Sequence, residues 1–329
     1  CEYAYSRKRN VVELRLGQTS TCAATSSDSP RFATPVTLRV HETENSYEHI
    51  YTIEDVSHSF EFAYHSKAKK VRKPKPRLGE EAMSGKLKDM CDWQLLDNDM
   101  VEDSPVLWMR VDPDMQLICS VSIRQTDYQW RNQLLMDRDV VGQYNALVAL
   151  RAFANRATSC ALIRAIADRR VFYRVRAEIV GTVAAVAARQ SDYDALKVFI
   201  RFFTAYYSLG TVPLVLDQEV EAPVMRPNRF TELSDYFVLK AIPSAVATIR
   251  DERGLPVADA VRLILCMLRF NDNTNCEYSD SYYIAQLVES LGTALYSPKA
   301  DIAVSGDRNH ISRESLHALS LLSIDEIER

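Results

Sequence analysis

The segment that most constrains the fold is a long helical pattern in the middle of the chain, residues 172–189. Its apolar side chains recur at the spacing of one helix face, at Ile179, Val180, Val183, Ala184 and Val186. Small residues in the same segment are expected to let neighbouring helices approach closely: Gly181, Ala184, Ala185, Ala187 and Ala188. One such helix cannot bury its apolar face alone, so the pattern predicts a stack of HEAT-type helical repeats. Stacks of this kind mainly present surfaces to other macromolecules.

The composition is ordinary for a globular protein. The 329 residues are 47% apolar and carry a net charge of −4, so any affinity for nucleic acid must come from local basic patches. No run approaches the roughly 18 consecutive apolar residues of a membrane span. The chain begins at Cys1 without a methionine, which suggests an internal fragment in which a missing targeting segment says little. Seven scattered cysteines without a CxxC pair favour reduced thiols in a cytosolic or nuclear protein.

The first 65 residues have the period of two that is typical of β-strands. A hairpin is predicted around the polar turn of residues 6–10, and further strands around residues 36–40, 50–53 and 60–64. Strand character returns at Val106–Val111, and a last strand is predicted over Met115–Ile123. Apolar residues on one face with polar residues on the other predict an antiparallel sheet or a small sandwich.

A highly charged segment, residues 66–104, separates the two groups of predicted strands. It opens with seven cations and no acid, and acidic residues follow: Lys67, Lys69, Lys70, Arg72, Lys73, Lys75 and Arg77 are the cations. This composition predicts a flexible loop that interrupts the sheet domain. The cations are suited to binding phosphates through counterion release or to serving as an import signal, and a loop that is merely solvated is the third interpretation.

From Asp127 onward the period becomes helical. Helices are predicted near residues 127–138, 139–153, 156–168, 172–190, 192–207, 230–253, 256–270, 279–296 and 311–322. An acidic and apolar loop over residues 208–229 separates two groups of helices and is a candidate surface for a partner. Pro243 is expected to kink or split its helix, and Gly254 followed by Pro256 is expected to end it and start the next.

Arginines gather around the turn before the 172–189 segment: Arg164, Arg169, Arg170, Arg174 and Arg176. We expect them mainly to bond backbone carbonyls or to pair with Asp168, and contact with DNA is the alternative. Three tyrosines near the C-terminus are expected to pack in the core and between helices, because no basic residues are interleaved with them: Tyr278, Tyr282 and Tyr283.

Motifs for chemistry are absent from the sequence. There is no HExxH zinc motif, no glycine-rich phosphate loop and no GxSxG nucleophile turn. The histidines are expected to be surface or half-buried strand residues rather than metal ligands. No catalytic residue, cofactor or metal site is therefore predicted.

Several strings together resemble one family in order and spacing. They are WMRVDPDM at Trp108–Met115, the segment Gln129–Leu147, FYRVRAE at Phe172–Glu178, and Arg269–Leu291. Residues 3–18 and the basic segment 63–75 are similar to the same family, that of the TBP-associated factor 2 subunits of the general transcription factor TFIID. Residues 19–32 and 208–229 look unlike it, which suits a fungal or otherwise distant member.

The resemblance implies an architecture like that of a puromycin-sensitive aminopeptidase, with the catalytic domain lying before this chain. The predicted fold class is α+β: an antiparallel β-sandwich over residues 1–122, interrupted by the loop 66–104, and then a HEAT-like superhelix over residues 123–329. The joint between them is expected to be sealed by apolar side chains: Trp108, Val111, Leu117 and Ile123. In this family the zinc motif is degenerate, so the resemblance implies a scaffold without enzymatic activity or cofactor.

The function implied by the resemblance is that of a nuclear structural subunit of TFIID that helps to assemble the complex and to recognise the core promoter at the initiator. The implied partners are TBP and other TFIID subunits, particularly subunits 1 and 8, with neither a membrane nor a small-molecule substrate. Promoter DNA is a possible partner for the 67–77 cations and for Arg169, Arg170 and Arg174. The alternatives are the C-terminal half of an active zinc aminopeptidase, which the upstream sequence would reveal, and a HEAT-type transport or scaffold protein, which the predicted sandwich disfavours.

Overall fold

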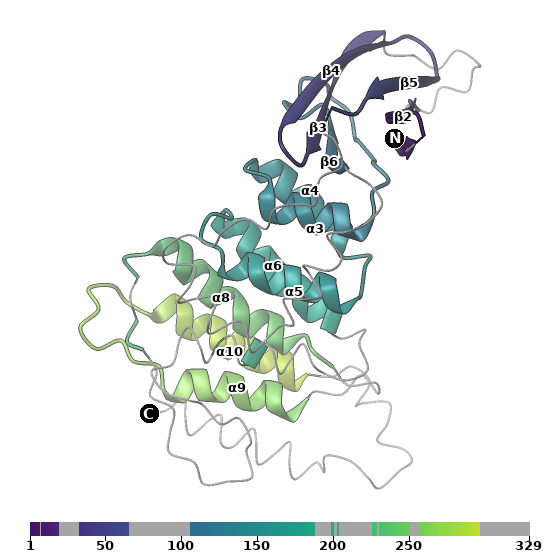
Figure 1. Cartoon of the computed structure of the whole chain (residues 1–329). Coiled ribbons are helices and arrows are strands. Elements are labelled where there is room, and N and C mark those ends of the chain that lie inside the picture. Colours follow the sequence, from purple (N-terminus) through teal and green to yellow (C-terminus); the bar gives the residue numbers. More distant parts are fainter. Residues whose placement is uncertain are drawn as a thin grey trace, which may run out of the picture. The chain divides into compact units, whose positions relative to one another are not determined.

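The computed structural model describes residues 1–6, 8–19, 33–65, 106–187, 199–200, 203, 226–228, 230–250 and 257–296. They fall into two compact units (Figure 1). The described residues up to Leu150 form the first unit, and those from Arg151 onward form the second. The loop 66–104 with its seven cations lies outside the described residues, as do the predicted helix 311–322, the Gly254–Pro256 junction and nearly all of the 208–229 loop.

The first unit contains two three-stranded antiparallel sheets, as the alternating pattern predicts. One sheet has the order β1-β2-β5, with β1 at Glu2–Ser6, β2 at Val11–Gly17 and β5 at Ser57–Ala63. The other has the order β4-β3-β6, with β3 at Thr34–Glu42, β4 at Ser46–Ile53 and β6 at Val106–Val111. Their inner faces share one core: Val12, Leu14, Leu38, Val40, Phe62, Tyr64, Val106 and Met109.

Stacked rings link the consecutive strands β4 and β5, which belong to different sheets. The ring centroids of Tyr51 and Phe60 lie 4.2 Å apart, and those of His49 and Phe62 lie 4.5 Å apart. The four side chains occupy every second position of their strands, so they all lie on one face of each strand, the face that points inward. His49 therefore has an aromatic packing role and a lowered pKa, because burial disfavours its charged form.

The predicted strand at Met115–Ile123 is wrong, because the chain there is irregular and bent. The carboxylate of Asp112 accepts hydrogen bonds from the backbone amides of Gln116 and Leu117, at 2.9 Å each, and so holds the chain in a turn. Asp112 and Met115 both have positive φ, and Ile118 is fully exposed. The alternation of apolar residues here does not correspond to a buried face.

Two helices complete the first unit, and the start of the first of them covers the free edge of β6. Helix α3 spans Asp127–Met136 and α4 spans Val140–Leu150. The side chain of Gln125 accepts from the Met109 amide at 3.0 Å, and the side chain of Gln129 donates to the Val106 carbonyl at 3.2 Å. Gln129 also forms a reciprocal capping box with Thr126 at the start of α3. An edge strand with unpaired backbone groups is thereby covered.

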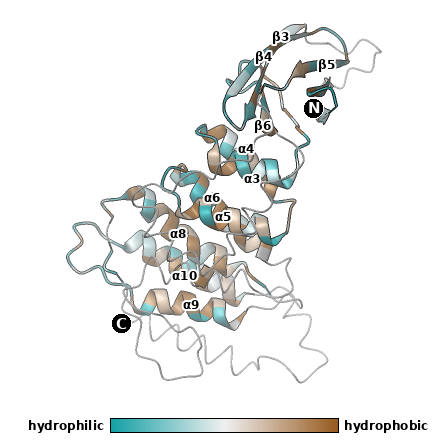
Figure 2. Cartoon of the chain, viewed as in Figure 1, coloured by the Kyte–Doolittle hydropathy of each residue, from teal (hydrophilic) through white to brown (hydrophobic). Residues whose placement is uncertain are grey.

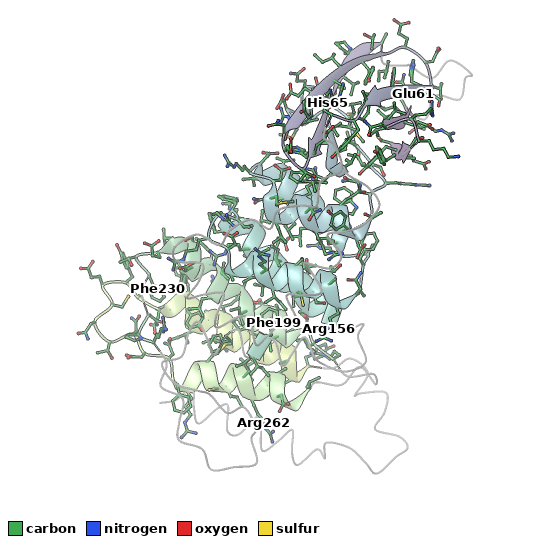
Figure 3. All side chains as sticks on the ribbon, in the orientation of Figure 1. Glu61, His65, Arg156, Phe199, Phe230 and Arg262 are labelled. Carbon is green, nitrogen blue, oxygen red and sulfur yellow. The ribbon has the colours of Figure 1, made fainter. Side chains whose placement is uncertain are left out.

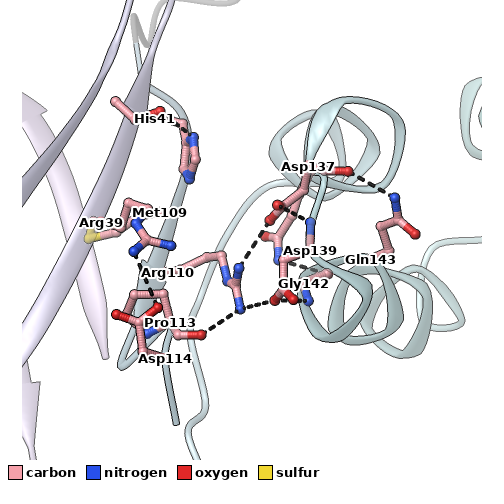
Figure 4. Close-up of polar contacts among 12 residues, drawn as sticks. Arg39, His41, Met109, Arg110, Pro113, Asp114, Asp137, Asp139, Gly142 and Gln143 are labelled. Carbon is pink, nitrogen blue, oxygen red and sulfur yellow. Dashed lines mark hydrogen bonds and ion pairs between the residues drawn. The ribbon is translucent and has the colours of Figure 1, made fainter. Parts of the chain in front are cut away.

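A charge cluster around the buried pair of Arg110 and Asp137 fixes the turn between α3 and α4 against the outer face of β6 (Figure 4). The Arg110 guanidinium lies 2.5 Å from an Asp139 oxygen and 3.5 Å from an Asp137 oxygen, and it donates to the Pro113 carbonyl at 3.2 Å. Burial raises the pKa of Asp139, but the Gly142 amide and the Arg110 charge outweigh it and lower the pKa overall.

The junction between strands and helices is therefore more polar than the sequence predicts. Trp108 is buried there as expected; it stacks on His41 with 4.1 Å between ring centroids and lines a small pocket with Met136. Val111 packs instead against the core between the sheets. Leu117 and Ile123 are only partly buried.

The second unit consists of packed helices, as the 3.6-residue period predicts. Its helices are α5 at Arg156–Ala167, α6 at Tyr173–Ala187, α8 at Leu233–Ala247, α9 at Ala258–Arg269 and α10 at Ser281–Leu295. Apolar residues line these helices (Figure 2). On α6 the predicted face is buried: Ile179, Val180, Val183, Ala184 and Val186 are each at most 2% exposed. Gly181 and Ala185 are exposed, so the prediction that they allow close helix approach is wrong.

Helices α6, α8 and α10 lie side by side and run in the same direction. Tyr173 in the first turn of α6 contacts Phe237 in α8, and Lys240 of α8 contacts Tyr282 in the first turn of α10. At the opposite end, Arg250 just after α8 donates to the carbonyls of Thr293 and Tyr296 at the end of α10. Alternate helices thus form one layer, as in helical repeat proteins.

The remaining helix predictions have mixed outcomes. Helix α8 runs unbroken through Pro243, so the predicted split is absent. Of the predicted helix 192–207, only Phe199, Ile200 and Phe203 are described; they are helical and buried. Cys160 is buried and is not part of a disulfide, and burial raises the pKa of Cys266 to about 11, as expected for inert reduced thiols.

Candidate interaction surface

The turn between α5 and α6 brings the predicted arginines into two different environments. Asp168 follows α5, and its carboxylate accepts from Arg170 through the backbone amide at 2.9 Å, Nε at 2.9 and 3.0 Å, and Nη2 at 2.6 Å. Burial raises the pKa of Asp168, but the hydrogen bonds and charge of Arg170 lower it overall. Arg170 is thus held by the partner that the sequence suggested.

A second carboxylate, Asp235 in the first turn of α8, joins two of the arginines. Its oxygens lie 3.1 Å from Arg176 Nη1 and 2.5 Å from Arg169 Nη2. Arg176 is buried and also donates through Nε to the Ile166 carbonyl at 2.7 Å. Arg176 therefore ties α5, α6 and α8 together, and the sequence alone gave no sign of Asp235 as its partner.

Arg174 differs from the other arginines of the turn. It is exposed, its Nε donates to the Tyr173 hydroxyl at 3.2 Å, and its Cζ lies 5.9 Å from the centroid of the Tyr173 ring. No carboxylate lies within ion-pair distance of it among the residues that the structure describes. Its guanidinium remains available to an external anion.

The contacts of Arg170 and Arg176 are those that a structural role predicts. A DNA contact of Arg169, Arg170 or Arg174 stays a prediction, and so does one of the 67–77 cations, which lie outside the described residues. The structure brings Arg169, Arg170 and Arg174 to one turn of the second unit.

Beside Arg174 lies a group of aromatic side chains, here called the aromatic row: Phe172, Tyr173, Tyr236, Phe237 and Tyr282. The first four form a series of contacting rings, and Tyr282 joins them through Lys240. Ring centroids are 4.8 Å apart for the first pair, 5.3 Å for Tyr173 and Phe237, and 5.6 Å for Tyr236 and Phe237. Lys240 Nζ lies 5.7 Å from the Tyr282 ring centroid. Phe230, labelled in Figure 3, packs edge-on against Tyr236. The row thus begins before α6 and crosses the first turn of α6, the first two turns of α8 and the first turn of α10.

The aromatic row corrects the prediction for the C-terminal tyrosines. Tyr283 is 3% exposed and packs in the core as expected, but Tyr282 is 77% and Tyr278 is 57% exposed. Adjacent residues of a helix point about 100° apart, and on α10 only Tyr283 of this pair lies on the buried side. The basic neighbour of Tyr282 is Lys240, which is 42 positions away in sequence and was therefore missed.

Metal and membrane sites are not found in the described part of the chain. No group of three or more His, Cys, Asp or Glu side chains there could hold a metal ion. His58 instead accepts from the backbone amides of Glu54 and Asp55 through Nε2, at 2.9 and 2.8 Å. Among the same residues, no helix combines the length and the apolar character needed to cross a bilayer.

Comparison with known proteins gives a consistent result along the whole chain. Residues 1–126 match the family model described as "TAF2 Ig-like domain", and residues 127–329 match "TAF2-like, TPR repeats". "Transcription initiation factor TFIID subunit 2" of Danio rerio is 32% identical over 99% of this chain and 25% of its own length. The proteins of the same name from Gallus gallus and Drosophila melanogaster are 31% and 30% identical, over 99% of this chain and 26% and 25% of their own lengths.

The chain thus spans about a quarter of the length of these relatives. All three are animal proteins, so they do not establish the expected fungal origin. The Ig-like match coincides with the two antiparallel sheets, and the repeat match begins at the first residue of α3. The sequence, the fold and both matches agree, and the chain belongs to the family of TFIID subunit 2.

Proposed function

We propose that this chain is a non-catalytic, structural part of a nuclear TFIID subunit. The observation that carries the proposal is the consecutive match of both halves of the chain to the two TAF2 family models. The fold gives it physical support, because stacked helices and a sandwich supply extended surfaces rather than a reaction site. The proposed partners are TBP and the other TFIID subunits, particularly subunits 1 and 8.

The test of assembly is purification of the full-length protein from nuclear extract through an affinity tag, followed by quantitative mass spectrometry. Recovery of TBP and the other subunits in near-stoichiometric amounts is expected. Pairwise co-expression with subunit 1 or subunit 8 then tests those partners separately. Recovery of the protein alone would contradict the proposal.

The alternative, an active zinc aminopeptidase, predicts the same fold and so needs a chemical test. We expect the purified full-length protein to hold less than stoichiometric zinc and not to hydrolyse aminoacyl-p-nitroanilides. Zinc at one equivalent together with chelator-sensitive hydrolysis would favour the enzyme. Zinc content and hydrolysis test only the aminopeptidase alternative. Neither measurement tests the surfaces described above.

We further propose that the chain contributes to recognition of the core promoter around the initiator through its basic residues. The candidates are Arg174 and the 67–77 cations, with Arg169 and Arg170 as weaker ones because carboxylates already pair with them. Each phosphate neutralised contributes about 0.9 to the slope of log affinity against log salt concentration. The salt slope of promoter binding therefore measures how many phosphates the protein contacts.

The experiment compares promoter binding by assembled TFIID containing wild-type protein, Arg174→Gln, Arg170→Gln, or neutralised 67–77 cations. Arg174→Gln and the neutralised 67–77 cations are expected to reduce the salt slope. Arg170→Gln should leave the slope nearly unchanged and serves as the charge-matched control. If all variants bind an initiator promoter with the wild-type slope, this chain does not contact DNA.

A further inference from the structure

The aromatic row is an unusual feature for the surface of a helical repeat unit. Phe237 is 42% exposed and Phe172 is 39% exposed, while Leu233, one turn before Phe237, is 59% exposed. Single exposed apolar residues are normal, but contacting ones that span several helices mark a binding surface. The ring contacts between Phe172, Tyr173, Tyr236 and Phe237 restrict their rotamers, which reduces the side-chain entropy that binding would cost.

A small pocket opens within the row. Its lining residues are Tyr173, Arg174, Ala177, Glu178 and Phe237, and its volume is about 290 Å³. The lining thus combines two aromatic rings and an alanine with one arginine and one glutamate. This arrangement suits one apolar side chain with a negative charge close to it.

The charges around the row are unevenly compensated. Asp235 is paired with Arg169 and Arg176, and Glu178 lies 3.5 Å from Arg151. Arg174 and Lys240 each lie over a tyrosine ring and have no carboxylate partner among the described residues. Helices α6 and α10 each pack beside α8 in the same direction, so the positive ends of the three helix dipoles add to the same sign at this edge.

We propose that the aromatic row docks an extended acidic segment of a partner protein. An apolar side chain of the segment enters the pocket beside Phe237, and carboxylates lie against Arg174 and Lys240. The inference deepens the proposed function and rests on it only for the origin of the partner, which would be another TFIID subunit. The recognition itself follows from apolar and charge complementarity.

Single-stranded nucleic acid also stacks on aromatic residues beside cations, but the row fits it less well. A nucleic acid strand carries a phosphate at every nucleotide, whereas the row offers Arg174 and Lys240 as its cations without a carboxylate partner among the residues that the structure describes. Glu178 lines the pocket, and Glu232 precedes α8. These carboxylates repel a polyphosphate. A peptide has fewer charges, so its acidic side chains can contact the cations of the row and avoid the carboxylates.

The test uses the full-length protein and a fluorescein-labelled 14-residue peptide built from Asp, Glu, Leu and Phe, with binding followed by fluorescence anisotropy. Phe237→Ala is expected to weaken binding about tenfold or more, as for a central aromatic contact. Arg174→Gln combined with Lys240→Gln should weaken it severalfold and reduce its salt dependence. Tyr144→Ala is the matched control, because Tyr144 on α4 is 43% exposed.

The remaining outcomes separate this inference from the proposed function. Equal affinities of wild type, Phe237→Ala and the double variant overturn the inference, as does tighter binding of a fifteen-nucleotide oligo-dT or of a lysine-substituted peptide. Circular dichroism confirms that each variant is folded. The probe peptide comes from no TFIID subunit. Peptide binding therefore tests the aromatic row, and co-purification with TBP tests the proposed function, so either one can fail without the other.

Discussion

Gly142 occupies a position in α4 where a side chain does not fit. A Cβ atom there would lie 2.3 Å from Asp137 Oδ2 and 3.2 Å from Arg110 Cζ, and both groups are fixed by the charge cluster. We expect Gly142→Ala to lower the free energy of unfolding by about 1–3 kcal/mol through overpacking. Urea unfolding followed by circular dichroism measures the change.

The matched control is Gly181→Ala on α6, where a new Cβ meets no atom within 4 Å. Alanine favours a helix over glycine by about 0.5–1 kcal/mol, so this variant should be more stable than wild type. Changes of the same sign in both variants would refute the packing argument at Gly142.

His41 gives the first unit a dependence on pH. Burial, together with the nearby charges of Arg110 and Arg39, lowers its pKa from 6.5 to about 4. The unfolded chain therefore binds more protons between these pH values, and the free energy of unfolding decreases as the pH falls from 6.5 towards 4. His41→Phe preserves stacking on Trp108 and removes this titration.

Thermal unfolding of His41→Phe and wild type between pH 7 and pH 4 is the measurement. The variant should lose less stability on acidification than wild type. The low-pKa carboxylates Asp139 and Asp168 are common to both proteins, so only the difference reports His41. Parallel curves would show that its protonation is not linked to folding.

At the scale of elements, Gln129 joins a helix start to a sheet edge. Its Oε1 accepts from the Thr126 amide at 3.1 Å, and its Nε2 donates to the buried edge at the Val106 carbonyl. Gln129→Glu keeps the capping acceptor but places a carboxylate against that carbonyl. We expect a loss of about 1–3 kcal/mol in the free energy of unfolding, measured by urea titration.

Gln116→Glu is the control for the same chemical change on an exposed side chain. Its effect should stay within about 0.5 kcal/mol. If Gln129→Glu is equally mild, α3 does not depend on the hydrogen bond to β6.

Elements with a strong local period were predictable, and elements decided by one side chain were not. The strands around Val12 and Val40 and the helix through Val183 all bury the face that their spacing indicates. Met115–Ile123 has an equally suggestive alternation, yet the Asp112 carboxylate competes for its backbone amides. Pattern reasoning has no access to such a competition.

The same distinction applies to the candidate surface. The ion pair between Arg170 and Asp168 was predictable, because the two residues are two positions apart in the same turn. Asp235 meets Arg169 and Arg176 only because α8 packs on α6, and the aromatic row likewise combines side chains from α6, α8 and α10. Contacts across the layer depend on packing that no local window contains.

For the whole molecule, the compact units of the structure end at a different residue from the domains that the sequence and the family models indicate. The predicted boundary lies at residues 122 and 123, and the family models meet at residues 126 and 127. The first compact unit continues to Leu150, because α3 and α4 cover Arg110 and the edge of β6. We propose that a stable first domain requires both helices.

The prediction compares two fragments, residues 1–126 and residues 1–150. The longer fragment should unfold cooperatively. The shorter one should melt at lower temperature and associate as its concentration rises, because its open β6 edge is free to pair with another chain and Arg110 has lost Asp137 and Asp139. Differential scanning calorimetry and light scattering measure both effects. Equal melting temperatures without association would instead place the end of the domain before α3.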